Sequence, residues 1–297
     1  KNEERRVFDN PDQIHQATTV TVETNTTIDA SASENGDGGT VVVWSDIKNQ
    51  QSVTTVQGEI LARGGENGGD GGQIETSGYV LEVAGASIAA GATQGTGGLW
   101  LLDPSDMTID QSVANTYVSS LDGGSDVLNE VSGNIVMSDN VVIDKTTGGD
   151  ATLTLKASDK ITLGSGSKII SSPEAGKLNV TLYANHSDAA GGIVLNNATI
   201  TSNGGDIVLG GNGDPVNNAA YGTPNGVDLG SGTSLDAGIG NISIRGQSYK
   251  NDGYGSGIGV NMLAGLTGNN IAIYGTGAPQ NGLNNWGVNI TASIPAS

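Results

Sequence analysis

Carboxylates are the most numerous groups in this sequence that could do chemistry. Of the 297 residues, 31 are Asp or Glu, and two carboxylates on either side of a glycosidic bond are what a glycan-cleaving enzyme needs. Several of them lie beside glycine, namely Asp37, Asp70, Asp150 and Asp206. Because Asp at such positions caps tight turns, we expect a structural role for these side chains. Asp103 and Asp106 are close in sequence, but a proline turn explains that pair.

Other reactive groups are sparse. His15 and His186 lie far apart and near no nucleophile motif, and cysteine is absent. The glycine cluster at 64–72 is similar to a calcium-binding nonapeptide, but its copies recur at roughly 30 residues rather than in tandem every nine. Lys and Arg total only 12 residues, too few for a cleft that neutralises uronates. The sequence therefore predicts a protein that is not an enzyme and has no cofactor and no metal site.

The composition favours a thin core that repeats many times. Glycine occurs 48 times, phenylalanine once, and aromatic residues make up 4% of the chain. Such a chain cannot fill one thick core, but each layer of a solenoid needs only a few aliphatic side chains. The net charge of −19 disfavours binding to nucleic acid or anionic lipid. Because no apolar run approaches the ~20 residues of a membrane span, we expect no membrane insertion.

Short alternating strands recur in triplets through the C-terminal half. The first strands of the triplets carry Leu153/Leu155, Val180/Leu182, Ile207/Leu209, Ile242/Ile244 and Ile271/Ile273. The second strands carry Ile161/Leu163, Ile193/Leu195, Val227/Leu229, Ile258/Val260 and Val288/Ile290, and the third centre on Ile169, Ile200, Leu235 and Leu266. Period-2 alternation gives each strand one inward row that only a stacked neighbour can bury.

The N-terminal part has the same organisation. Ile28, Ile60 and Ile88 each precede a glycine pair, after which a new strand begins at TVVVW, QIETSG or LWLLD. We therefore predict an all-β fold, a right-handed parallel β-helix of about ten coils with three strands each. At the ~4.8 Å spacing of paired strands, ten coils give a rod about 50 Å long. Gly, Asn and Asp are expected at the corners, where sharp bends need positive φ or side-chain caps.

The domain organisation predicted from this repeat is a single solenoid over residues 1–297. Regular coils are expected at 17–110 and 134–297. Residues 111–133 interrupt the rhythm and carry Tyr117 and Leu121 at helical spacing, so we expect an irregular insertion with one short helix.

Aromatic side chains gather in the connections between first and second strands. Since coils stack in register, these connections emerge from the same edge of the solenoid. They carry Tyr183, His186, Tyr221, Tyr249, Tyr254 and Trp286. Stacked loops with rigid aromatic platforms suit a glycan or protein ligand; the alternative is that these rings only cover the flank of the rod.

Six Asn-x-Ser/Thr sequons could accept a glycan. They begin at Asn25, Asn179, Asn185, Asn197, Asn241 and Asn289. A chain this rich in Asn, Ser and Thr produces several by chance, and several lie in expected strands, where Asn can form a ladder. Asn185, in an expected loop, is the best glycosylation candidate.

Phrases along nearly the whole chain resemble the filamentous-haemagglutinin-like exoproteins of two-partner secretion systems, including the high-molecular-weight adhesins. The matching residues include GDGGTVVVWSD (36–46), GEILARGGENGGDGGQIETSG (58–78), GLWLLDPSDMTID (98–110) and ATLTLKASDKITLGSGS (151–167). The resemblance implies a β-helical exoprotein, exported by an outer-membrane transporter, that attaches to host or bacterial surface glycans or proteins. We see no secretion domain of that family here, so a shaft segment of a longer exoprotein is expected.

The function expected from these observations is a non-catalytic secreted or cell-surface bacterial adhesin segment, a rigid shaft whose loops bind weakly to glycan or protein. One alternative is a structural subunit of an extracellular filament, formed by end-to-end self-association through unpaired strand edges. A lesser alternative is a polysaccharide-cleaving β-helix enzyme, since enzymes also occur on this fold.

Overall fold

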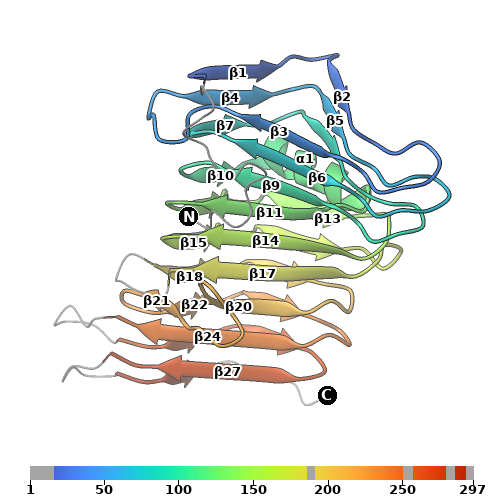
Figure 1. Cartoon of the computed structure of the whole chain (residues 1–297). Coiled ribbons are helices and arrows are strands. Elements are labelled where there is room, and N and C mark those ends of the chain that lie inside the picture. Colours follow the sequence, from blue (N-terminus) through green and yellow to red (C-terminus); the bar gives the residue numbers. More distant parts are fainter. Residues whose placement is uncertain (1–16, 186–190, 250–256, 279–284, 292–297) are drawn as a thin grey trace. The chain divides into compact units, whose positions relative to one another are not determined.

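The computed structural model describes residues 17–185, 191–249, 257–278 and 285–291 (Figure 1). The chain forms two compact units. Unit 1 comprises Lys1–Met107 and Asn115–Ser132, and unit 2 comprises Thr108–Ala114 and Gly133–Ser297. Both units are built from short parallel strands, three to a turn, which is the parallel β-helix predicted from the sequence. The described strands form about nine turns, close to the predicted ten.

Unit 1 contains three parallel sheets. The first sheet is β1 (Thr19–Val22), β4 (Val53–Val56) and β7 (Val80–Glu82). The second is β2 (Thr27–Asp29), β5 (Glu59–Leu61) and β8 (Ser87–Ala89). The third is β3 (Thr40–Trp44), β6 (Gln73–Ser77), β9 (Leu99–Asp103) and β11 (Asp126–Val131). Along the chain, β10 (Met107–Ile109) marks the passage between the units.

Unit 2 repeats the same three positions. One sheet contains β12 (Ile135–Met137), β15 (Lys160–Leu163), β18 (Gly192–Leu195), β22 (Val227–Leu229), β25 (Val260–Met262) and β28 (Val288–Ile290). A second contains β13 (Val142–Lys145), β16 (Lys168–Ser171), β19 (Thr199–Thr201), β23 (Ser234–Asp236) and β26 (Gly265–Thr267). The third contains β14 (Ala151–Ala157), β17 (Leu178–Ala184), β20 (Ile207–Gly211), β24 (Ile242–Ser248) and β27 (Ile271–Thr276), with β21 (Ala220–Gly222) beside β24.

Alternation within each strand produces the core of unit 2. The inward residues of the third sheet form two continuous ladders. These ladders contain the same residues that the sequence repeat assigns to the first strand of each triplet. One ladder is Leu153, Val180, Ile207, Ile242 and Ile271, and the other is Leu155, Leu182, Leu209, Ile244 and Ile273. From Leu153 to Ile244 these side chains are at most 1% exposed. Burial of one such side chain contributes about 1.5–3 kcal/mol, so stacking stabilises what no turn could bury alone.

Corners of the solenoid use left-handed backbone, as the sequence predicted. In four successive turns of unit 2, the residue two positions before the strand of the second sheet (β13, β16, β19 or β23) has positive φ. These residues are Asn140 (φ 60°), Gly166 (φ 74°), Asn197 (φ 49°) and Gly232 (φ 81°). Asn and Gly alternate there because they adopt this conformation at the least steric cost.

Each turn carboxylate identified in the sequence bonds the backbone of the next coil. Asp37 Oδ1 accepts from Asp70 N–H at 2.8 Å, and Asp70 Oδ1 accepts from Thr96 N–H at 2.8 Å. The equivalent bonds of unit 2 run from Lys177 N–H to Asp150 Oδ1 at 2.9 Å and from Asn241 N–H to Asp206 Oδ1 at 2.8 Å. These four side chains therefore have a structural role, which is to tie successive coils together rather than to cap their own turns.

The predicted helix is α1 (Gln111–Asp122), which replaces a strand between β10 and β11. Asp110 caps it by accepting from Val113 N–H at 2.9 Å. Within unit 1, Tyr117 and Leu121 are fully buried, as helical spacing indicated. The irregular insertion is shorter than the predicted 111–133, because β11 returns to regular pairing with β9. That all coils form one continuous solenoid stays a prediction.

Candidate functional site

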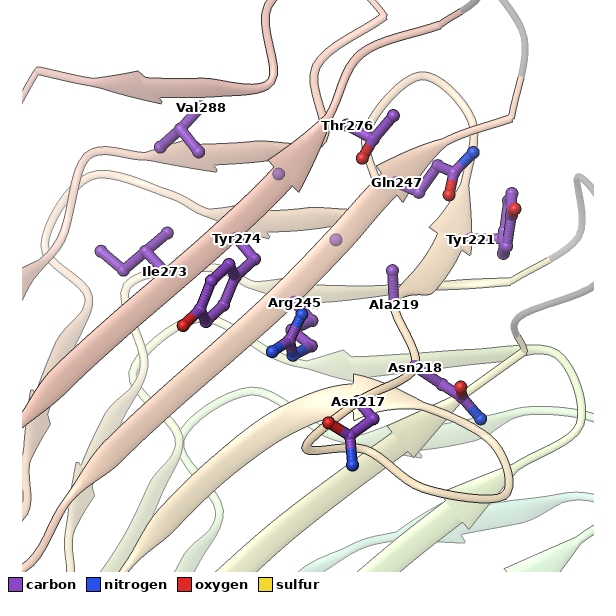
Figure 2. A pocket seen from close by; sticks show the side chains of 12 residues that line it. Asn217, Asn218, Ala219, Tyr221, Arg245, Gln247, Ile273, Tyr274, Thr276 and Val288 are labelled. Atoms are coloured by element: carbon purple, nitrogen blue, oxygen red, sulfur yellow. The ribbon is translucent and has the colours of Figure 1, made fainter.

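A groove of about 690 Å³ lies against the last strands of the third sheet of unit 2 (Figure 2). Outward side chains of β24 and β27 line it, together with Ile273 of the inward row and Val288 of β28. Strands β24 and β27 form its floor, β21 borders it, and the segment 217–219 forms a wall. Figure 2 shows the side chains of Arg245 and Tyr274 next to one another, with Gln247 and Thr276 further along the same strands.

Strand alternation determines which side chains face the groove. Because Ile242 and Ile244 point into the core, Arg245 and Gln247 of β24 point outward. Register then places Tyr274 beside Arg245 and Thr276 beside Gln247. Between the two outward rows lie inward glycines. A Cβ atom on Gly246 would come within 2.2 Å of the carbonyl oxygen of Gly259, so that position admits only glycine.

The wall is an insertion between β20 and β22. The chain leaves β20 at Gly211, and β21 returns so that Tyr221 pairs with Gln247. Asp214 shapes the loop by accepting hydrogen bonds from Val216 N–H at 3.1 Å and from Asn217 Nδ2 at 2.6 Å. Arg245 fastens it from below, because its Nε–H donates to the carbonyl oxygen of Val216.

The groove has one positive centre. The Arg245 guanidinium lies 3.8 Å from the centroid of the Tyr274 ring, in cation–π contact. Hydrogen bonds from Asn217, together with the charge of Arg245, hold the pKa of Asp214 below its usual value. Asp214 is therefore ionised at neutral pH, but its oxygens already accept the bonds of its own loop.

Of the six residues predicted at this edge, four are described. Tyr221 and Tyr249 come together, with ring centroids 6.4 Å apart and an edge-to-face angle of 70°, and Tyr221 lines the groove. Tyr183 lies in β17 rather than in a loop, and is half-buried on the outer face. Trp286 is 49% exposed and does not line the groove. His186 and Tyr254 lie outside the described residues.

Sequence reasoning missed the two side chains at the centre of the groove. The residues predicted to bind were assigned to the connections between strands, whereas Arg245 lies in β24 and Tyr274 in β27. A signal was present: each follows the second inward isoleucine of its strand, so equal phase places them side by side across the sheet.

The structure corrects the assignment of Asn185. This residue is only 7% exposed, and its carbonyl oxygen accepts from Tyr221 N–H at 2.7 Å. A side chain so enclosed cannot accept a glycan without local unfolding. Two sequon residues occupy exposed turns instead, Asn25 and Asn197, both with positive φ.

Trp100 and Trp44 differ in environment. Trp100 is fully buried and donates from Nε1 to Thr76 Oγ1 at 3.0 Å. Trp44 is partly exposed on the outer face of β3. Neither lies in the groove of unit 2.

Within the described residues there is no group of three or more His, Asp or Glu side chains able to hold a metal ion. In the same part of the chain, α1 is too short and too polar to cross a bilayer. Comparisons of the whole chain with protein-family models and with curated proteins found no match to either.

Proposed function

We propose that this chain is a non-catalytic segment of an extracellular bacterial adhesin, in which β-helical coils carry a weak binding site for a surface glycan or protein. The observation that carries the proposal is the groove of unit 2, where Arg245, Tyr274 and Tyr221 meet on an otherwise regular sheet. The resemblance of the repeat phrases to exoproteins of two-partner secretion systems supports the extracellular location and export by an outer-membrane transporter.

The construction of unit 2 suits a load-bearing shaft. Strand follows strand in parallel register through all three sheets, so the backbone groups of each turn bond to the turns on either side. A pull along such a stack is shared among many hydrogen bonds. Weak sites repeated on many copies of such a shaft add to firm attachment through multivalency.

A non-catalytic role is supported by how the acidic side chains are used. In each of Asp37, Asp70, Asp150 and Asp206, the oxygen Oδ1 accepts a hydrogen bond from a backbone N–H group of the adjacent coil. This repeated bond gives the four carboxylates a shared structural role between coils. Incubation with polysaccharides should accordingly release no reducing ends or unsaturated products.

Strand edges favour a second candidate, the subunit of an extracellular filament. Among the described residues, β27 and β28 each have a strand neighbour on one side only. The side-chain ladder of the same sheet is also extendable: Asn289 Nδ2 donates to Asn261 Oδ1 at 2.8 Å, and Asn261 Nδ2 donates to Asp228 Oδ1 at 2.9 Å. Edges of this kind can pair with a second copy.

Adhesion of coated beads tests the two candidates. Beads bearing the purified chain should attach to glycan- or matrix-coated surfaces, while the soluble chain binds weakly. The double variant Tyr221→Ala/Tyr274→Ala should reduce attachment, and Thr162→Ala, an outward change on another sheet, should not. Absence of attachment together with continuous fibres in negative-stain electron microscopy would replace the adhesin by the filament subunit.

A further inference from the structure

We infer that the groove of unit 2 binds a carboxylate-bearing sugar residue of a short glycan, with Arg245 as the anchor for the carboxylate. This inference rests on the proposed function, and specifies the chemistry of its ligand. Three features carry it: a fixed guanidinium, a row of polar side chains beside it, and the pairing on both sides of β24, the strand that carries Arg245.

Arg245 is held in place before any ligand arrives. Its Nε–H donates to Val216, and its guanidinium rests on the ring of Tyr274. The two terminal nitrogens make no hydrogen bond to the described residues, so a bidentate fork remains for an anion. Arg245 is also the only arginine in the sequence after Arg63, which makes its outward position in the groove unusual for this chain.

The neighbouring row offers hydroxyl and amide groups. Tyr221, Gln247 and Thr276 face outward at equivalent positions of three adjacent strands, spaced by the ~4.8 Å of a sheet. None of their side chains has a hydrogen-bond partner among the described residues. Together with Tyr274, which is 52% exposed, this row matches the hydroxyls and the apolar C–H face of a sugar ring.

The form of the groove argues against two other anions. A peptide recognised by strand addition needs a free sheet edge. The strand that carries Arg245, β24, is paired with β21 on one side and β27 on the other, and the free edge of β27 faces away from β24. A long polyanion would face the net charge of −19 over much of the surface. A short glycan with one carboxylate is repelled far less, and one arginine can hold it even though the 12 cationic residues are too few for a cleft that neutralises a chain of uronates.

Calorimetry with the full chain tests the inference. The probes are an oligosaccharide containing glucuronic acid, its neutral glucose counterpart, and an acidic peptide of the same charge. The uronate should bind most tightly. Arg245→Gln should weaken the uronate by about tenfold or more, the scale of one charge-assisted bidentate contact, and should weaken the uronate more than the neutral sugar. Lys168→Gln, which removes one exposed positive charge from another sheet, is the matched control and should leave affinity within about twofold.

A second variant keeps the test valid if Arg245→Gln displaces the loop that forms the wall of the groove. Gln247→Ala removes an amide from the polar row and does not touch the contact to Val216, so it should weaken both sugars while circular dichroism stays unchanged. Equal binding of uronate and neutral sugar, or an undiminished Arg245→Gln variant, overturns the inference and leaves the adhesin intact. Binding of the peptide alone also overturns it. Failure of coated beads to attach to any surface is the separate result that rejects the proposed function.

Discussion

Replacing Tyr117 and Asn129 singly and together tests how α1 is locked into unit 1. Asn129 Nδ2 donates to the Tyr117 hydroxyl at 2.8 Å, and both residues are fully buried. The Tyr117 ring also meets Trp100 edge-to-face, with centroids 5.7 Å apart. Burial raises the pKa of Tyr117 far above its usual value, so the hydroxyl stays protonated and the pair can be measured at any pH near neutral.

The magnitudes follow from what each variant leaves unpaired. Asn129 Oδ1 has no hydrogen-bond partner among the described residues. Tyr117→Phe therefore leaves the whole amide buried without a partner, at about 1–3 kcal/mol. Asn129→Leu leaves the Tyr117 hydroxyl buried without a hydrogen-bond partner, at a similar cost of about 1–3 kcal/mol. The double variant replaces both partners by apolar groups and should be nearly neutral, so the coupling energy, the double-variant change minus the sum of the two single changes, has a magnitude of about 2–6 kcal/mol.

Urea unfolding, followed by tryptophan fluorescence and circular dichroism, measures this coupling. Trp100 lies against Tyr117 and reports on the same interior. Ser119→Ala, at an exposed position of α1, is the control and should change the free energy of unfolding by less than about 0.5 kcal/mol. Additivity of the two single variants within about 0.5 kcal/mol would refute the pairing.

Two further predictions concern the turns of unit 1. The hydrogen bond from Thr96 N–H lowers the pKa of Asp70 in the folded chain. The Asp70 carboxylate therefore stabilises the fold at pH values above its pKa in the unfolded chain, roughly 3.9. This stabilisation is lost as the pH falls through the lower pKa of the folded chain. Acid titration should show that Asp70→Asn loses less stability than the parent chain in this window; identical acid unfolding curves would exclude a role for the carboxylate. Gly71→Ala should prevent native folding, because its Cβ would lie 1.7 Å from the carbonyl oxygen of Ala90. Gly149→Ala, whose Cβ would meet nothing within 4 Å, should melt like the parent in circular dichroism, and equal melting of both would contradict the packing argument.

Strand positions were predictable from the sequence because their determinants are local. Ile169, Ile200 and Leu235 each sit in a short alternating segment that follows a corner of Gly, Ser or Asn, and all three stack in register. Alternation fixes which side faces inward, and the repeat length fixes which strands pair. Both kinds of information are written within about 30 residues of sequence, the period of one coil.

The helix was predictable in kind but not in extent. Tyr117 and Leu121 revealed its inward stripe, and the glycines that follow mark its end, with Gly124 at φ 79°. β11 was missed because DVLNEV buries Asn129 inside the solenoid, and a polar residue at an inward position breaks the alternation that identifies a strand. Only the tertiary partner Tyr117 makes that asparagine acceptable in the core.

The groove depends on information of a different kind. The pair of Arg245 and Tyr274 could have been predicted from the sequence, because the phase of β24 and β27 places these two residues side by side once the repeat is aligned. The wall could not have been predicted, because the Gly- and Asn-rich connection shows no periodicity. In addition, β21 exists only through pairing of Ala220–Gly222 with a strand that follows it in sequence.

Close packing of the wall depends on one glycine. A Cβ on Gly210 would come within 2.1 Å of the carbonyl oxygen of Pro215. Glycine at position 210 thus lets the loop pack against the sheet, where the carbonyl oxygen of Val216 accepts the hydrogen bond from Arg245. The chemistry of the site is therefore set by the repeat, whereas its enclosure is set by how closely one insertion packs against it.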